Sequence, residues 1–362
     1  MTNKNELTAR RLQTLTLSKK VTVSIIIVTY NSKDVIGENL QSLLAQSFQD
    51  FEIIVVDNTS SDGTPEYVEK NYAAVRVLRS RSNLGYCGGN ALGARFAKGN
   101  YIVVLNPDVV LDRYWLEELL SASARFPQAA ILGSNILFYE KPSRVNTYGV
   151  RVHYTGLAFT RGSGSSQVDC REEKVLAPAG TAFLVLKSVI ADIPFFDPDY
   201  FMELGEVDFA IRALLAGGEV RIIPSSKVYH KYVYKMNPRR LYGLERSRYK
   251  LLINNFSKRT LAILVPSLLL TELVTFSFSF YAGKQFMRSK IDAVIYSIKY
   301  FRQKRKKATV YYKKNDKEIL KLMDWIIEVP ESTISNLGIK LPVKKILDAA
   351  YSKLYHLALS ML

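Results

Sequence analysis

The feature that most constrains the fold is an apolar, β-branched run that recurs through the first third of the chain. VTVSIIIVTY at 21–30 is β-branched or aromatic at every position except Ser24, which is typical of a strand buried on both faces of a parallel sheet. Shorter runs of this kind follow at 51–56, 75–78 and 101–105, and the stretches between them have helical spacing. This alternation predicts an α/β fold with a doubly wound, mainly parallel sheet.

Polar residues stand where these predicted strands end. Thr29, Tyr30 and Asn31 close the first strand, Asp57 closes the second, and LNPD at 105–108 closes the fourth. Open α/β sheets bind ligands at the carboxyl ends of their strands, so we expect a binding site there. An aromatic ring can stack on a planar base, and a carboxylate can accept from a base N–H or a ribose hydroxyl. Each of these residues also suits a tight turn, and taken singly none decides between the two interpretations.

A glycine-rich segment, NLGYCGGN at 83–90, precedes a helix that we expect to begin near Ala91. Glycines let a backbone approach phosphate groups closely, and a following helix offers N–H groups at its positive dipole end. Arg81 lies just before the segment and can pair with a phosphate or a base. Glycine is also frequent in ordinary turns, so this segment alone is weak evidence.

The remaining chain divides into a middle part and a basic C-terminal part. Further strands are expected at about 131–138, 150–159 and 175–186, with two short ones at 220–223 and 227–230. Residues 1–20 are polar without an apolar core, which predicts a flexible lead-in and not a signal peptide. We therefore expect three parts: a flexible lead-in at 1–20, an α/β domain at 21–241 and a helical, membrane-associated region at 242–362.

The C-terminal region has the composition of a membrane-associated segment. Residues 260–283 are apolar apart from Glu272 and long enough to cross a bilayer, which needs about 20 residues. Glu272 and Pro266 inside this stretch both argue against crossing. A basic block follows between 284 and 314, a pattern that attracts anionic lipid headgroups, and 346–362 is an amphipathic helix candidate.

Overall charge and cysteine content limit the partners. With 50 Lys and Arg against 33 Asp and Glu the formal charge is +17, which attracts nucleic acid, anionic lipid or phosphorylated substrates. Because the basic residues crowd behind an apolar segment, we expect an anionic membrane surface and no nucleic acid as partner. Two distant cysteines, Cys87 and Cys170, predict free thiols in a reducing compartment, with no disulfide framework or zinc site.

In this order and at these spacings, VSIIIVTYNS, VVDNTSSDGT, NLGYCGGNALG and LNPD resemble the family 2 glycosyltransferases of the GT-A fold, in their rhamnosyltransferase-like branch. The resemblance covers about residues 21–257. It departs at Asn90-Ala91, where the family usually has two asparagines. It implies that a donor nucleotide is held by the following residues: Thr29, Tyr30, Asn31, Asp57, Arg81, Asn83, Gly85 and Asn90.

The resemblance also implies a divalent cation, manganese or magnesium, at Asp108, which matches the last acid of the family's metal-binding motif. Asn106 replaces the first acid, as is usual in this branch, so one carboxylate holds the metal. His230 matches a histidine near the metal and diphosphate, although a lone histidine is more often structural. Asn106, Gly180 and Thr181 correspond to the pocket for the donor sugar.

FMELGEVDF at 201–209 resembles the family's acidic signature at the start of a helix. By that register Glu206 is the catalytic base and Asp208 the following acid, while Gly205 replaces the first acid of the pair. The two roles can be exchanged. Acids also favour the first turn of any helix because of its dipole, which is the structural alternative. Arg212, one turn after Asp208, is expected to pair with it.

The resemblance thus implies a metal-dependent, inverting transfer of rhamnose or a hexose from a nucleoside diphosphate donor to a hydroxyl of a growing, lipid-linked glycan. The site is expected at the cytoplasmic side of the cell membrane. Arg246 and Arg248 can grip a diphosphate, or belong to a solvated helix face. Two rivals remain: a non-catalytic sugar-nucleotide-binding scaffold, and a basic nucleic-acid-binding protein.

Overall fold

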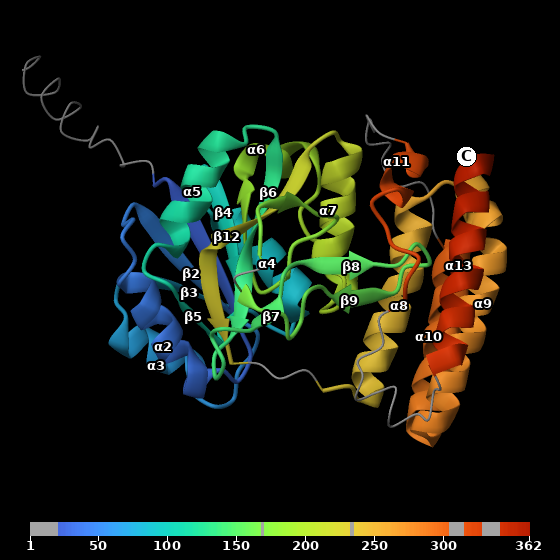
Figure 1. The fold of residues 1–362 in the computed structure, drawn as a ribbon. Coiled ribbons are helices and arrows are strands. Elements are labelled where there is room, and N and C mark those ends of the chain that lie inside the picture. Colours follow the sequence, from blue (N-terminus) through green and yellow to red (C-terminus); the bar gives the residue numbers. More distant parts are fainter. Residues whose placement is uncertain (1–20, 168–169, 232–234, 304–314, 328–340) are drawn as a thin grey trace, which may run out of the picture.

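The computed structural model describes residues 21–167, 170–231, 235–303, 315–327 and 341–362 (Figure 1). The expected lead-in 1–20 and much of the basic block, 304–314, lie outside the described residues. A mixed sheet forms the centre of the first part. Its main strands are β1 (Val23–Thr29), β2 (Phe51–Asp57), β3 (Val75–Arg79), β4 (Tyr101–Leu105), β6 (Ala129–Phe138), β10 (Glu173–Lys174), β11 (Ala182–Leu186) and β12 (Glu219–His230).

These strands lie in the order β10-β12-β6-β11-β4-β1-β2-β3. Neighbours are parallel except where β11 meets β4 and β6, and where β10 meets β12. The predicted mainly parallel sheet is therefore confirmed, and the antiparallel strands β10 and β11 make it a mixed one. Since β1, β2, β3, β4, β6 and β12 all run the same way, their carboxyl ends meet at one edge.

Helices cover both faces of this sheet. They are α2 (Lys33–Leu44), α3 (Thr64–Asn71), α4 (Gly85–Phe96), α5 (Trp115–Arg125), α6 (Lys187–Asp192) and α7 (Gly205–Leu215). Along β1, Ile25 and Ile27 belong to the core under α2, α3 and α5, whereas Ile26 belongs to the core under α4 and α7. Burial of both faces explains why the 21–30 run lacks the alternation of a half-exposed strand.

The middle part differs in detail from the sequence-based expectation. The strand expected at 150–159 is a hairpin of β8 (Val150–Val152) and β9 (Ala158–Thr160), because Gly156 takes a left-handed φ of 86° at the turn. Only 182–186 of the strand expected at 175–186 is a strand. The two short strands expected at 220–223 and 227–230 are one strand, β12, with an irregular register between Ile223 and Lys227.

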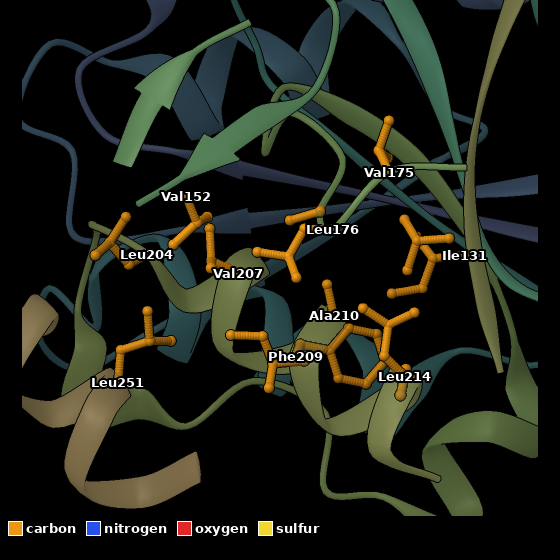
Figure 2. Close-up of a cluster of buried hydrophobic side chains, with 14 of the residues drawn as sticks. Ile131, Val152, Val175, Leu176, Leu204, Val207, Phe209, Ala210, Leu214 and Leu251 are labelled. Carbon is orange, nitrogen blue, oxygen red and sulfur yellow. The ribbon is translucent and has the colours of Figure 1, made fainter. Parts of the chain in front are cut away.

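Helix α7 lies at the junction of the two parts of the chain. In Figure 2 its side chains Phe209 and Leu214 lie near Ile131 of β6, and Leu251 approaches from the neighbouring helix. That neighbour, α8 (Pro238–Asn255), begins where Asn237 accepts a capping hydrogen bond from the Arg240 N–H. The start of α7, directly after Leu204, is therefore held between the central sheet and α8.

The C-terminal region consists of α8 followed by α9 (Lys258–Ala282), α10 (Lys284–Gln303), α11 (Asp316–Leu320) and α13 (Leu341–Met361). Figure 1 shows α9, α10 and α13 side by side, with α8 between them and the sheet. Within the described part of the chain, α9 is the one helix long and apolar enough to cross a membrane. The division of the chain near residue 242 falls inside α8 and stays a prediction.

Candidate active site

The ends of β1 and β2 bring the first predicted nucleotide residues together. Thr29 and Asp57 are partners in the parallel register, and the Thr29 hydroxyl donates to Asp57 Oδ1 at 3.2 Å. The Ser60 N–H donates to the other oxygen of this buried carboxylate at 3.0 Å. Asn31 takes a left-handed φ of 51°, and its Oδ1 accepts from the Ser61 N–H at 2.8 Å. Tyr30, between them, is 54% exposed, so its ring is accessible to a flat ligand.

Asn58 is a residue that the sequence reasoning missed. Its Nδ2 donates to the Gly85 carbonyl at 2.9 Å, and its Oδ1 accepts from the Leu84 N–H at 3.3 Å. It therefore fastens the end of β2 to the glycine-rich segment. The available signal was its position directly after Asp57, where a buried amide can bridge two backbone segments.

The sequence predicts a glycine-rich loop followed by a helix that begins near Ala91. This prediction is wrong, because α4 already begins at Gly85 and includes most of the segment. Asn83 Oδ1 accepts from the Gly85 N–H at 2.8 Å, which holds the entry to the helix. Gly85 has a φ of 67°, and a β-carbon there would lie 2.4 Å from the Phe201 carbonyl oxygen. The Cys87 N–H donates to that same carbonyl at 2.9 Å. These glycines serve close contact between α4 and the loop that leads to α7.

The last two predicted nucleotide residues lie in opposite surroundings. Arg81 is exposed and forms no ion pair with the residues that the structure describes. Asn90 is buried within α4, where its Nδ2 donates to the Tyr86 carbonyl one turn earlier at 2.9 Å. Its Oδ1 accepts no hydrogen bond from the described residues. Arg81 is thus open to a ligand's phosphates, whereas Asn90 offers only one amide oxygen.

Glu206 lies in the first turn of α7 and faces Gly180. A β-carbon on Gly180 would stand 3.3 Å from the carboxyl carbon of Glu206 and 3.2 Å from the Tyr86 hydroxyl oxygen. That hydroxyl donates to the Gly180 carbonyl at 2.6 Å. The glycine therefore keeps a space open between the carboxylate and α4, as a pocket for a small group requires.

Burial raises the pKa of Glu206 to about 7, because a charged carboxylate is disfavoured away from water. The nearby Glu203 carboxylate raises this pKa further, whereas the Arg240 guanidinium and a backbone hydrogen bond lower it. The Glu206 side chain nevertheless keeps partial access to solvent. A carboxylate with a pKa near neutrality is well suited to general-base work.

The loop before Glu206 is strained. Phe201 and Leu204 have φ values of 60° and 64°, in the left-handed region that favours glycine. Leu204 directly precedes the first residue of α7, so the strained conformation sets the direction in which the helix starts. Such strain is kept only where the surrounding contacts determine it, here the Cys87 and Gly85 contacts with Phe201.

Asp208 has a different environment from Glu206. Arg212 Nη2 lies 2.8 Å from Asp208 Oδ2, which confirms the expected pairing. Asp208 Oδ1 accepts from the Tyr200 hydroxyl at 2.9 Å and from Asn255 Nδ2 at 2.8 Å. With both oxygens of a fully buried carboxylate held by donors, Asp208 suits a positioning role, and Glu206 is the acid that faces the pocket.

Asp108 and His230 meet at the ends of the β4–β5 connection and β12, since β5 (Val109–Leu111) pairs with the end of β12. His230 Nε2 lies 3.3 Å from Asp108 Oδ1, a buried oxygen that accepts no hydrogen bond from described residues. His230 Nδ1 lies 3.2 Å from Asn146 Oδ1, which orients the ring. The pair fits the protein's share of a divalent cation site, to which phosphate oxygens and waters add. A third acidic, histidine or cysteine ligand is absent from the described residues.

The predicted sugar-pocket residues lie between Glu206 and the Asp108–His230 pair. The Asn106 N–H donates to the Thr181 carbonyl at 2.9 Å, so the segment carrying Asp108 lies beside Gly180. Asn39, which the sequence reasoning missed, donates from Nδ2 to the Asn106 carbonyl at 3.2 Å and to the Val109 carbonyl at 3.0 Å. The predicted base, sugar pocket and metal pair therefore form one continuous set of contacts.

Of the two arginines considered for a diphosphate, Arg248 is excluded by its surroundings. It is buried in α8 and forms ion pairs with Glu245 and Glu272. Arg246 donates from Nη2 to the Asp199 carbonyl at 2.6 Å and lies over the Tyr296 ring. Sequence could not tell these neighbours apart, because one of the two partners of Arg248, Glu272, comes from a different helix.

Comparison with known proteins finds similar sequences. Residues 24–193 match the family model described as Glycosyl transferase family 2. The N-acetylglucosaminyl-diphospho-decaprenol L-rhamnosyltransferase of Mycobacterium tuberculosis is 27% identical over 231 residues, which cover 57% of this chain and 75% of that protein. The UDP-Glc:alpha-D-GlcNAc-diphosphoundecaprenol beta-1,3-glucosyltransferase WfaP of Escherichia coli is 38% identical over 109 residues, covering 29% of this chain and 40% of that protein.

Solved structures are similar in fold. S. aureus TarS in complex with UDP-GlcNAc superposes with a TM-score of 0.54 at 16% identity, over 93% of this chain and 89% of that one. The mannosyltransferase PcManGT from Pyrobaculum calidifontis, in complex with GDP-Man and Mn2+, gives a TM-score of 0.51 at 14% identity, over 95% and 87%. At these identities the likeness shows the fold alone, and it confirms the expected GT-A-type sheet with flanking helices.

Proposed function

We propose that this chain, whose residues 24–193 match the family 2 glycosyltransferase model, transfers a sugar from a nucleoside diphosphate donor to a hydroxyl of a lipid-linked glycan. Rhamnose or a hexose is the proposed sugar, carried by a donor such as dTDP-rhamnose or a UDP-hexose. Support comes from the two relatives, whose names give a rhamnosyl and a UDP-glucosyl transfer to sugars on lipid diphosphates.

The observation that carries this proposal is the half-buried Glu206 beside Gly180, with a pKa of about 7. An acceptor hydroxyl in that space gives its proton to the Glu206 carboxylate. Its oxygen forms the new bond to the anomeric carbon while the bond from that carbon to the diphosphate breaks. One displacement of this kind inverts the anomeric centre and needs no covalent nucleophile from the protein.

The edge formed by β1 and β2 is proposed to hold the donor's nucleoside. The Asp57 oxygens each accept one hydrogen bond from the protein, and each keeps a lone pair for a ribose hydroxyl or a base N–H. The exposed ring of Tyr30 is suited to stack on the base. Arg81, which is exposed just before α4, is proposed to pair with phosphate oxygens.

Asp108 and His230 are proposed to hold a divalent cation, manganese or magnesium. When bound, such a cation supplies neutralising charge for the diphosphate that leaves. Asp108 Oδ1 offers a hard oxygen ligand, and His230 Nε2 a nitrogen beside it. The chain's own part is to keep these two atoms together, with Asn146 holding the histidine ring from behind.

The active site is proposed to work at the cytoplasmic side of the cell membrane. A lipid-linked acceptor requires the protein to approach a bilayer, and α9 gives weak support for this. Both described cysteines are free thiols, which suits a reducing compartment.

The test is release of nucleotide from a panel of nucleoside diphosphate sugars, with manganese, magnesium or EDTA. We expect metal-dependent turnover of one donor, reduced about a hundredfold to ten-thousandfold in Glu206→Gln. Glu66→Gln, at an exposed ion pair with Arg79, is the control and should keep full activity. A folded protein with no turnover and no donor binding across the panel would overturn the catalytic proposal and favour a non-catalytic scaffold.

A further inference from the structure

Helix α9 has one face that packs on protein along most of its length. Ser267, Thr271, Thr275 and Ser279 follow one another at every fourth residue and are buried. The Tyr154 hydroxyl donates to Ser267 Oγ at 2.9 Å, and the Thr271 hydroxyl contacts that of Thr155 at 3.0 Å. This inner face of α9 therefore rests on the turn between β8 and β9, which belongs to the sheet domain.

The charge inside α9 is also bound by protein. Glu272 lies 2.8 Å from Lys290 of α10 and forms an ion pair with Arg248 of α8. Both cations also pair with Glu245, so two acids and two bases form one network. Lys290 and Arg248 are almost fully buried, and removing one member would leave an uncompensated charge. The network ties α9 to α8 and α10.

The opposite side of the α9–α10 pair is apolar and exposed, and we call it the outer face. Leu269 and Leu273 of α9 are each 65% exposed. Monomeric soluble proteins seldom leave a continuous apolar surface of this kind uncovered. A groove of about 720 Å³ lies between the two helices, and residues of α8 also line it. The outer face consists of Val265, Leu269, Leu273, Phe280, Ile291, Ile295, Ile298 and Phe301.

Exposed cations flank both ends of the outer face. Lys258, Arg259 and Arg302 lie at the end where α9 begins and α10 finishes. Lys284 and Arg288 lie at the other end, beside the turn between the helices. Among the described residues of α9 and α10, Asp292 is the exposed acid. This charge is complementary to anionic headgroups at both ends.

We propose that the outer face of α9 and α10 lies in the plane of an anionic lipid bilayer, so that α9 lies along the membrane surface instead of crossing it. A crossing α9 would carry the hairpin of β8 and β9, whose turn packs on Ser267 and Thr271 near the middle of the helix, to the depth of the hydrocarbon, where open sheet edges are not tolerated. A crossing helix also favours cations on one side, whereas α9 has them at both ends.

This placement deepens the proposed function by saying how a lipid-linked acceptor reaches the site. Helix α8 joins the network to α7, since Leu251 belongs to the same buried cluster as Val207 and Phe209 of α7 (Figure 2). The Asn255 side chain of α8 also donates from Nδ2 to Asp208 Oδ1. A bilayer against the outer face therefore lies two helices away from the helix that carries Glu206. An acceptor's diphosphate and sugar stay at the headgroup level, and its lipid chain stays in the bilayer.

The first experiment is flotation of the full chain with vesicles of phosphatidylcholine and phosphatidylglycerol, without donor or acceptor. We expect wild type to float, and Leu269→Glu/Ile298→Glu to bind at least about tenfold more weakly, since two apolar side chains lose their burial. Leu44→Glu/Tyr114→Glu, at exposed apolar residues of the sheet domain, is the matched control and should bind like wild type. Equal binding of all three, or no binding of wild type, would overturn the proposal.

The second experiment decides the orientation of α9. Lys258→Cys and Lys284→Cys, each in a Cys170→Ser background, place a thiol at either end of α9, while Cys87 is buried. On sealed membrane vesicles, a membrane-impermeant maleimide should label both positions without detergent. Labelling of one position only after detergent would mean that α9 crosses the bilayer. A dimer that is lost in Leu269→Glu/Ile298→Glu, without lipid binding, would assign the face to a second copy. Either failure leaves the donor panel, and hence the transferase proposal, unaffected.

Discussion

The carboxyl carbon of Glu206 lies 3.3 Å from the position that a β-carbon on Gly180 would occupy. A contact at that distance is tighter than most, so any side chain at residue 180 must displace the carboxylate or its surroundings. The Tyr86 hydroxyl limits the same space from the α4 side, at 3.2 Å. The absence of one methyl group thus keeps the proposed base and the proposed sugar pocket open to each other.

Gly180→Ala should therefore lower kcat by about tenfold to a hundredfold, because small displacements of a reacting group have large effects on rate. Thermal unfolding should change little. Adding Tyr86→Phe removes the hydroxyl that limits this space, and the double variant should recover part of the loss. Wild-type kcat in Gly180→Ala would mean that the pocket does not need this space.

The rate should depend on pH through Glu206, whose ionised form is the base. We expect kcat/KM to rise with an apparent pKa of about 7 and to level off above it. Glu203→Gln should move this pKa down, because the Glu203 charge raises it, and Arg240→Gln should move it up. Shifts in the same direction for both variants, or a profile without a step near neutrality, would assign the titration elsewhere.

The free energy of unfolding should also depend on the Glu206 carboxyl group, but it should fall with rising pH where the rate rises. Because the pKa rises from 4.5 to about 7 on folding, the folded chain binds more protons than the unfolded chain between these values. Stability from this group is fully present below 4.5 and is lost as the pH rises through about 7. Glu206→Gln should thus be more stable than wild type at about pH 8, by roughly 1 to 3 kcal/mol. Denaturant unfolding at acidic and alkaline pH measures the difference, which should vanish in acid.

Removing the Asp208 carboxylate should destabilise the fold, since Arg212 would stay buried without its partner. We expect Asp208→Ala to lower the free energy of unfolding by about 3 to 5 kcal/mol. Glu66→Ala breaks an exposed pair with Arg79, where Glu66 is 61% exposed, and should change it by less than about 1 kcal/mol. Equal losses in the two variants would contradict the structural role of Asp208.

Metal activation should depend on the contact between Asp108 and His230. Asp108→Ala and His230→Ala should each raise the manganese concentration needed for half-maximal turnover at least about tenfold. Asn146→Ala, which removes only the partner of His230 Nδ1, should have a smaller effect in the same direction. Calorimetry of manganese with a nucleoside diphosphate gives a readout that is independent of turnover. Unchanged affinity in all three variants would place the metal elsewhere.

The sheet and the position of the site were predictable because both depend on local pattern. An uninterrupted β-branched run predicts a doubly buried strand, and Thr29 and Asp57 follow two such runs, so they had to meet at one edge. The start of α4 was not predictable in this way. Glycine disfavours a helix interior, yet Gly89 is needed here because a β-carbon would lie 2.6 Å from Val28.

Contacts between distant segments were also beyond reach. From sequence alone, Glu272 argues against a membrane crossing, and only the arrangement of α8 and α10 shows that Arg248 and Lys290 bind it. Asn58 and Asn39 donate to backbone carbonyls far along the chain. Asn58 follows Asp57 directly, but no local pattern identifies the carbonyl that either side chain contacts. The different surroundings of Glu206 and Asp208 were out of reach for the same reason, since the Tyr200 and Asn255 side chains that donate to Asp208 come from other elements.

The bond from the Cys87 N–H to the Phe201 carbonyl has a consequence for exchanging parts among related proteins. Residues 83–90 and 197–206 share a tight contact at Gly85, where even a methyl group would collide with the Phe201 carbonyl. If only one of these segments is replaced by that of a related protein, its backbone no longer matches the contact surface of the other segment. The two segments must be transplanted as one unit, and chimaeras that divide them should fail to accumulate as folded protein.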